Sequence, residues 1–256
     1  MDWGYLLSED DFRLYRNNIY LLEEQVIQNF PDYDRAPEIL TAIRNVPRHF
    51  FVHESYRYLA YTDHAFPTSG GLTTSAPSVI AEMIYHTGIK RGEKLLEVGT
   101  GTGYEAAVLS EMGVNVYTIE VDRTVALKAN RILMKLGYKA DKRVSNEQQR
   151  REILRDFHRV KKLFPYRGGI ELYMGNGRGG LPHKAPFHGI IVAASLLNVK
   201  NIEQLTDQLH DEGGRLVVPI GARKDQALHM FEKRKDKIHT FILEDISFNF
   251  VRMILE

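Results

Sequence analysis

The chain opens with apolar side chains at helical spacing. Three or four positions separate the members of this stripe, which are Phe12, Tyr15, Ile19, Leu22 and Val26. Ser8, followed three residues later by Asp11, is typical of a capping box at the start of a helix. A second, short helix is predicted over residues 37–45, because proline suits a first helical turn and Pro47 disfavours helix before it. We therefore predict a helical N-terminal part over residues 1–60.

From residue 93 onward, short apolar runs alternate with helical patterns. Residues 93–98 predict a strand that passes through a glycine turn into a helix, and residues 113–122 predict a second strand. Residues 239–255, rich in β-branched and aromatic side chains, predict terminal strands with an antiparallel edge. Such alternation predicts an α/β fold with a doubly wound, mostly parallel sheet. The remaining predicted elements are strands at 169–175, 188–195 and 214–221 and helices around 123–137 and 201–213.

A segment without clear periodicity joins these two parts. Residues 61–77 read YTDHAFPTSGGLTTSAP and are rich in glycine, serine, threonine and proline. They predict an extended loop before a helix over residues 78–88. Because such loops frequently carry functional residues, this loop is a candidate part of a site.

Composition and charge narrow the class of protein. Of the 256 residues, 43% are apolar and 26% are charged, which is ordinary for a folded chain with a sizeable core, and we predict one domain over residues 1–256. The 34 basic and 33 acidic residues give a net charge of +1, which argues against nucleic acid as the partner. The chain has no cysteine, which favours a cytoplasmic location. An acidic N-terminus and the lack of about 18 consecutive apolar residues argue against export and membrane insertion.

One segment departs from this charge balance. Residues 139–167 contain ten Lys or Arg and four Asp or Glu, hence a local charge of +6. We predict a helical insertion between two core parts, residues 61–138 and 168–256. Its basic side chains form either a solvated helix face or a surface for a partner or polyanion. The helix is indicated by an apolar stripe of Ile153, Phe157, Val160 and Phe164.

A glycine-rich turn follows the first predicted strand, with the sequence Glu97-Val98-Gly99-Thr100-Gly101-Thr102-Gly103. Glycines there allow positive φ and close approach of a ligand, although a turn alone also needs glycine. Glu97 ends the first strand and Glu120 ends the second, where a carboxylate can accept both ribose hydroxyls of a nucleoside. Two acids around one pocket suit a ligand that carries positive charge and no phosphates. S-adenosylmethionine, with its ammonium and sulfonium charges, is therefore the predicted cofactor.

A dinucleotide is the rival ligand. Gly101, Gly103 and Ala106 match the G-x-G-x-x-A pattern of dinucleotide-binding folds. In that pattern the first glycine follows the strand directly, whereas here Gly99 takes this place and Glu97 faces the would-be phosphates. The register therefore favours S-adenosylmethionine over NAD.

Several stretches together resemble one known family. The glycine turn lies in LLEVGTGTGYEAAVLSEM, which is similar to the first motif of class I methyltransferases, especially protein-L-isoaspartate O-methyltransferases. Further segments of that family are similar, in the same order, to VPRHFFVHESYRYLAY, GLTTSAP, APFHGIIVAAS and GGRLVVPIG. The resemblance covers residues 38–138 and 169–252. It implies a Rossmann-like methyltransferase fold and S-adenosylmethionine-dependent methylation of isoaspartyl carboxylates in damaged proteins or peptides, as a repair reaction.

The resemblance also implies roles for individual residues. Ser75 is the implied catalytic residue, which hydrogen-bonds the acceptor carboxylate, although a serine here could instead cap the following helix. Thr73, Thr74 and Pro77 are the implied substrate-binding residues, and threonines in such loops also satisfy local backbone groups. With the glycine turn and its acids, the predicted cofactor-binding residues are Glu97, Gly99, Thr100, Gly101, Gly103, Glu120, Val121, Asn176 and Gly177.

Departures from the family pattern concern mainly the acceptor side. The family usually reads G-Q-T-I-S-x-P, where this chain has Leu72 and Thr74 in place of the amide and the apolar residue. Asn176 stands where an acid would contact the adenine amino group, and its amide oxygen can accept the same bond. Residues 188–189 and 196–197 replace the usual acid and proline. Two alternatives therefore stay open: methylation of another peptide, small carboxylate or RNA, or cofactor binding without turnover.

The predicted site needs no metal. His49 and His53 are four residues apart and Glu54 follows, but the H-E-x-x-H pattern of a zinc site is missing. A carboxylate acceptor also needs no general base, which fits the lack of an evident catalytic triad. The predicted partner is a protein or peptide substrate.

Overall fold

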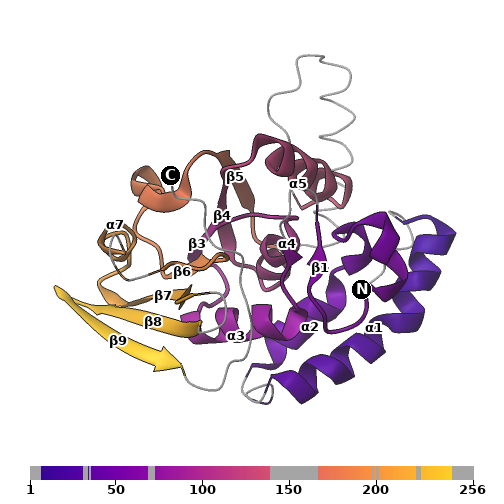
Figure 1. Ribbon diagram of the computed structural model, residues 1–256, viewed down its shortest axis with the longest axis horizontal. Helices are drawn as coiled ribbons and strands as arrows, with labels where there is room; N and C mark the ends of the chain where they lie inside the picture. The colour runs from indigo at the N-terminus through magenta and orange to yellow at the C-terminus, as the bar shows by residue number, and fades with distance from the viewer. Residues whose placement is uncertain are drawn as a thin grey trace.

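The computed structural model describes residues 7–30, 34, 36–68, 73–138, 167–197, 199, 202–222 and 226–243 (Figure 1). Its centre is a seven-stranded sheet with the order β5-β4-β3-β6-β7-β8-β9. All pairs from β5 to β7 are parallel, whereas β8 and β9 add an antiparallel edge, so the predicted α/β fold is confirmed. The bounds are β3 (Lys94–Val98), β4 (Asn115–Glu120), β5 (Ile170–Met174), β6 (Gly189–Val192), β7 (Glu212–Ile220), β8 (Ala227–Arg234) and β9 (Lys237–Leu243).

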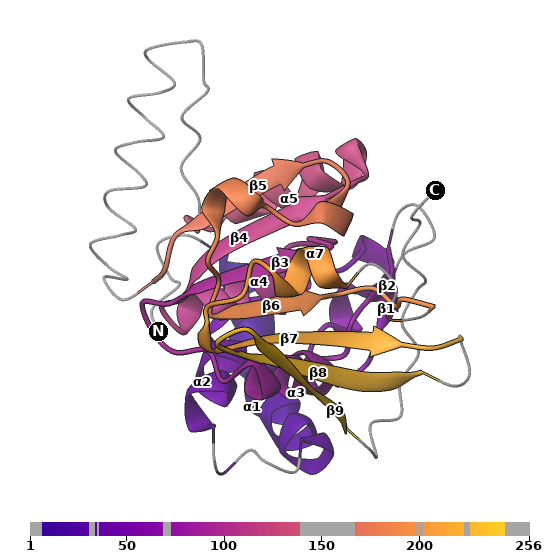
Figure 2. The ribbon, with the colours of Figure 1, turned by 90° about the vertical axis from the view of Figure 1, so that its left-hand side faces the viewer.

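Helices cover both faces of the sheet (Figures 1 and 2). Leu95 and Leu96 of β3 are both fully buried, but they belong to different apolar clusters because neighbouring strand residues point to opposite faces. α7 (Glu203–Thr206) contributes to the cluster around Leu96. The larger cluster, around Leu95, includes α1 (Glu9–Asn29), α2 (Pro37–Asn45), α3 (Pro77–Thr87), α4 (Tyr104–Glu111) and α5 (Arg123–Lys135).

The N-terminal helices form as predicted and add an outer layer beside α3 and α4. The side chain of Ser8 caps α1 by accepting a hydrogen bond from the backbone N–H of Asp11 at 3.2 Å. α2 has Pro37 in its first turn and ends before Pro47. Because α1 and α2 pack against α3 and α4, they support the elements that flank the glycine turn.

Short elements connect the main layers. Between α2 and α3 lie η2 (Arg48–Phe50), η3 (Glu54–Leu59), β1 (Phe66–Pro67) and β2 (Thr73–Thr74). β1 and β2 pair antiparallel, so the 61–77 segment, predicted as an extended loop, contains a small β-ladder. Between β5 and β6 lie η5 (Gly177–Gly179) and η6 (Pro182–Lys184).

The helix predicted around residues 201–213 is wrong in its extent, because α7 has only four residues. Gln208 leaves the helical path: its side chain accepts a hydrogen bond from the backbone N–H of Leu181 and donates one to the carbonyl of Gly179, each at 2.8 Å. Leu209 then forms a β-bridge with Phe187, and β7 begins two residues earlier than predicted. Contacts with a distant segment therefore replace the helical turns.

Strand β8 is a second difference, since no pattern in the sequence predicts it. It pairs with β7, the strand before it in the chain, along its whole length, so this pairing and not an apolar pattern defines it. Its partner β9 confirms the predicted antiparallel edge as far as Leu243. Residues 244–255 of the predicted terminal strands, and 139–166 of the predicted insertion, lie outside the described residues.

Candidate active site

The glycine turn connects β3 to α4 at the carboxyl edge of the sheet. Gly99, Gly101 and Gly103 have φ angles of +101°, +52° and +85°, a region that glycine adopts without strain. A Cβ atom at Gly101 would meet no atom within 4 Å, so this stretch of backbone faces open space. The turn therefore leaves room for a ligand against bare backbone.

Backbone contacts with β4 hold the turn in place. The N–H groups of Gly99 and Thr100 donate to the carbonyl of Ile119 at 2.9 and 3.3 Å. The buried hydroxyl of Thr100 lies 2.6 Å from that of Thr118. The Thr100 hydroxyl is thus occupied by a bond within the protein, so Thr100 would bind a cofactor through its backbone.

Glu120 is fixed against the same turn. One carboxylate oxygen accepts from the N–H of Gly101 at 2.9 Å, and the other accepts from the N–H of Asp122 at 3.0 Å. Each oxygen keeps a further lone pair with which it can accept a hydroxyl of a ligand. Val121, the next residue, is 61% exposed at the end of β4. This geometry suits the predicted contact with ribose.

Glu97 is a buried acid without a hydrogen-bond partner. Its side chain is 1% exposed, and neither carboxylate oxygen has such a partner among the residues that the structure describes. Burial, and next the nearby charge of Glu105, raises the pKa of Glu97 well above its usual value. The nearby Thr118 hydroxyl counteracts this rise in part, and it lies 2.6 Å from the Thr100 hydroxyl. A cationic group would satisfy both oxygens, so the site fits the ammonium of S-adenosylmethionine.

Asn176 and Gly177 lie beside the ends of β3 and β4. The side-chain oxygen of Asn176 accepts from the backbone N–H of Arg178 at 2.9 Å and caps η5. A Cβ atom at Gly177 would lie 2.5 Å from Val98 Cγ1 and 3.0 Å from Ile119 Cγ2, so only glycine fits. Gly177 thereby holds Asn176 next to the glycine turn. The predicted contact of Asn176 with adenine stays a prediction.

Ser75 lies just before α3 and is half-buried. The alternative of a helix cap is not observed: Ala76 is the N-cap residue of α3 and no side chain caps it there. The N–H of Ser78 instead donates to Asp63 Oδ1 at 2.9 Å. No described residue is bonded to the Ser75 hydroxyl, so this hydroxyl is available to a ligand.

The other predicted substrate residues differ in exposure. Thr74 is buried, and its hydroxyl oxygen accepts from the N–H of Phe66 at 3.1 Å, which is the local backbone role considered for it. Thr73 is exposed, and Pro77 is buried in the first turn of α3. Only Thr73 among these three therefore presents an exposed side chain.

Asp63 is a residue that sequence reasoning missed. Beside its bond to Ser78, its Oδ2 accepts from Asn29 Nδ2 at 2.7 Å, and its N–H donates to Gln25 Oε1 at 3.0 Å. It thus connects α1 to the start of α3. An acid within the 61–77 loop, which also contains Ser75, is a weak signal in the sequence, because the partners of Asp63 lie up to 38 residues away.

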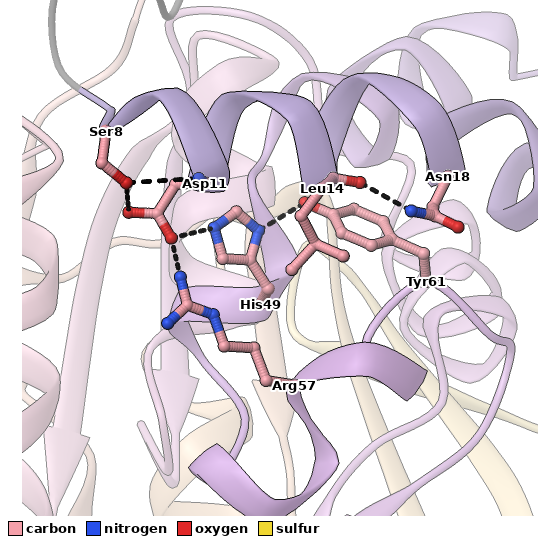
Figure 3. A network of polar contacts seen from close by, with 7 residues as sticks. All are labelled: Ser8, Asp11, Leu14, Asn18, His49, Arg57 and Tyr61. Carbon is pink, nitrogen blue, oxygen red and sulfur yellow. Dashed lines mark hydrogen bonds and ion pairs between the residues drawn. The ribbon is translucent and has the colours of Figure 1, made fainter.

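The two histidines considered as metal ligands have other partners in the fold, and Figure 3 shows those of His49. His49 is buried, with Nδ1 2.7 Å from the Tyr61 hydroxyl and Nε2 3.4 Å from Asp11 Oδ1. Burial, and next the charge of Lys135, lowers the pKa of His49 to about 4, so the ring is neutral at pH 7. Arg57 is therefore the charged partner of Asp11. His53 caps η3 by accepting from the N–H of Ser55.

Comparison with known proteins shows the family. The model of the family Protein-L-isoaspartate(D-aspartate) O-methyltransferase matches residues 22–253. A protein-L-isoaspartate O-methyltransferase of Opitutus terrae is 36% identical over 231 residues, which are 90% of this chain and 84% of that protein. One of Syntrophobacter fumaroxidans is 37% identical over 194 residues, 76% of each chain.

Solved structures agree on the fold. A structure named protein-L-isoaspartate O-methyltransferase gives a TM-score of 0.68 at 24% identity, over 90% of this chain and 65% of that one. A Plasmodium falciparum structure in complex with S-adenosyl-L-homocysteine gives 0.61 at 19% identity, over 92% and 97%. No helix in the described part of the chain is both long and apolar enough to cross a membrane. These matches confirm the predicted resemblance: the chain belongs to the protein-L-isoaspartate(D-aspartate) O-methyltransferase family, whose members use S-adenosylmethionine.

Proposed function

We propose that this protein methylates the carboxylate of isoaspartyl residues in damaged proteins or peptides, with S-adenosylmethionine as methyl donor. The observation that carries the proposal is the buried, unpartnered Glu97 beside the open glycine turn, in a chain whose family match runs through both this turn and Ser75. A buried carboxylate without a partner is costly unless a ligand satisfies it. The site is therefore suited to a cationic cofactor.

Specific residues would hold the cofactor. Glu97 would pair with its ammonium group, Glu120 would accept its ribose hydroxyls, and the backbone at Gly101 would contact it closely. Asn176 and Gly177 would border the adenine. When bound, the cofactor supplies a methyl group on a sulfonium sulfur, so that a C–O bond to the acceptor forms as the C–S bond breaks.

Ser75 would orient the acceptor. Its hydroxyl, to which no described residue is bonded, can donate a hydrogen bond to one carboxylate oxygen and leave the other to accept the methyl group. The carboxylate is already a nucleophile, so no side chain has to remove a proton. The exposed Thr73 would contact the peptide around it, and Thr74 and Pro77 would shape the loop.

We also propose a cytoplasmic location and a protein or peptide as the partner. The absence of cysteine supports the cytoplasmic location, and the balanced charge supports a protein or peptide over nucleic acid as the partner.

Transfer of a labelled methyl group tests the function. Three acceptors are offered at equal concentration: an isoaspartyl peptide, its normal aspartyl twin and an RNA. We expect base-labile label in the isoaspartyl peptide alone. Label in the twin or in RNA would identify another acceptor, and no label from a protein that binds S-adenosylhomocysteine would refute turnover.

Ser75→Ala sharpens the same assay. Because one positioned donor is removed from the reacting carboxylate, we expect turnover to fall on the order of ten- to a thousand-fold. The Kd for S-adenosylhomocysteine, measured by calorimetry, should change less than about threefold, since Ser75 lies outside the cofactor set. Full activity in this variant would contradict the role of Ser75.

A further inference from the structure

Arg48, the first residue of η2, is a fully buried arginine in contact with both halves of the candidate site. It is 0% exposed, its Nε has no described hydrogen-bond partner, and it forms no ion pair with a described carboxylate, although the charge of Asp63 is near enough to favour its charged form. A guanidinium in such a place must be satisfied by other groups, because an unpaired buried charge is costly. The groups that satisfy it reveal what it holds together.

Four backbone carbonyls accept hydrogen bonds from Arg48. Its Nη1 donates to the carbonyls of Ala60 at 2.8 Å and Thr62 at 2.9 Å. Its Nη2 donates to those of His64 at 2.7 Å and Ser75 at 3.2 Å. The planar guanidinium thus joins the two ends of the 61–77 loop and binds directly to the residue that would orient the acceptor.

Two aromatic rings flank the same guanidinium. Its central carbon lies 5.2 Å from the ring centre of Phe66 and 5.4 Å from that of Tyr104. Phe66 belongs to β1, which pairs with Thr73–Thr74, directly before Ser75. Tyr104 is the first residue of α4 and follows Gly103 of the glycine turn. Arg48 is thereby in contact with the loop on one side and the cofactor turn on the other.

We propose that Arg48 is a positioning residue that fixes Ser75 relative to the cofactor turn and so aligns the acceptor carboxylate with the methyl donor. This inference rests on the proposed function. In-line transfer depends steeply on alignment, and a displacement of about 1 Å can cost about a hundredfold in rate. Arg48 acts through Ser75 and touches neither substrate nor cofactor.

Two variants of Arg48 and one matched control test the proposal. Arg48→Met removes all four bonds, whereas Arg48→Lys keeps the charge and part of the bonding. The control is Arg44→Met, because Arg44 lies one turn earlier on α2 and pairs with Glu23 at 3.4 Å, away from the loop. Thermal denaturation establishes the folded fraction, and kcat and KM for an isoaspartyl peptide are measured per folded molecule.

We expect Arg48→Met to lower kcat about a hundredfold and Arg48→Lys to recover about tenfold of that loss. KM for the peptide and the Kd for S-adenosylhomocysteine should stay within about threefold, because neither ligand contacts Arg48. Arg44→Met should keep kcat within about twofold. A merely structural role of Arg48 would instead lower the stability of the two Arg48 variants and leave their kcat per folded molecule unchanged.

A double-mutant cycle isolates the route through Ser75. In a Ser75→Ala background, Arg48→Lys should change kcat less than about twofold, since the group that it positions is gone. An equal factor in both backgrounds, or an unchanged kcat in the wild-type background, would overturn the proposal. The cycle needs only the lysine variant, so it decides the matter even where Arg48→Met does not fold. Lack of wild-type turnover would refute the proposed function itself.

Discussion

Two buried glutamate side chains, Glu111 at the C-terminal end of α4 and Glu97 in β3, are in opposite circumstances. At the C-terminal end, Glu111 accepts from the Tyr138 hydroxyl at 2.8 Å and from Arg167 Nε and Nη2 at 2.7 and 2.6 Å. In β3, Glu97 has no described hydrogen-bond partner. Burial raises the pKa of both carboxyls, and Arg167 counteracts this rise at Glu111. Burial alone therefore does not mark a site; at Glu97, burial coincides with two oxygens that lack described partners and with the open glycine turn.

The largest expected effect is on stability, at Glu111, whose carboxylate has its partners. Glu111→Ala leaves the charge of Arg167, whose side chain is 7% exposed, without its partner. We expect a loss of about 3–5 kcal/mol in the free energy of unfolding, measured with urea. Glu171→Ala is the control, because its pair with Lys184 is half exposed and should contribute about 0–1 kcal/mol. Equal losses in the two variants would break the comparison.

At the cofactor site, by contrast, we expect the main effect on ligand binding. Glu120→Ala removes the acceptor beside Gly101, and we expect the binding of S-adenosylhomocysteine to weaken by about 1–3 kcal/mol, measured by calorimetry. NAD should not compete in the same experiment. Glu111→Gln serves as the control, with unchanged affinity expected of the folded fraction. Unchanged affinity in Glu120→Ala would refute the ribose contact.

The stability of the protein should depend on pH through Glu105, a buried glutamate near Glu97. Burial raises the pKa of Glu105, the second residue of α4, to about 8, against about 4.5 for an exposed carboxyl. The folded protein therefore binds more protons than the unfolded one between these values. The resulting stability is fully present below pH 4.5 and is lost as the pH rises to about 8.

The measurement is the free energy of unfolding of the ligand-free protein from pH 5 to 8. Glu105→Gln should flatten its decline with pH by up to about 1.4 kcal/mol per pH unit. Parallel curves for the variant and the wild type would show that Glu105 is ionised in the folded state.

The smallest effect is expected from the predicted insertion. Both residues that flank 139–166 meet at Glu111, and the guanidinium carbon of Arg167 lies 4.2 Å from the ring centre of Tyr138. We expect a short Gly/Ser loop in place of 139–166 to change stability by less than about 1 kcal/mol and cofactor affinity less than about twofold. Loss of cofactor binding in the folded variant would instead assign the segment to the site.

How far the sequence predicts this molecule depends on whether a residue pattern marks the element or site. The β3-α4-β4 unit is predictable because its strands, glycines and acids follow one another within about 28 residues. Strand β8 is not, since its ladders with β7 and β9 define it and no apolar run of its own does. The same holds within the site. Glu97 and Glu120 are visible as strand ends. Arg48 lies in a segment that resembles the family, but no pattern in the sequence indicates its bonds to carbonyls 12 to 27 residues away.

The Asp11 contacts in Figure 3 have a practical consequence for where the protein can be shortened. The family match begins at residue 22, in the middle of α1. A fragment cut at that boundary would lose Asp11 yet keep Arg57 and the buried His49, both of which lie against it. Sequence shared with relatives and the smallest autonomous folding unit therefore have different N-terminal limits, and proteolysis or fragment expression should respect the start of α1.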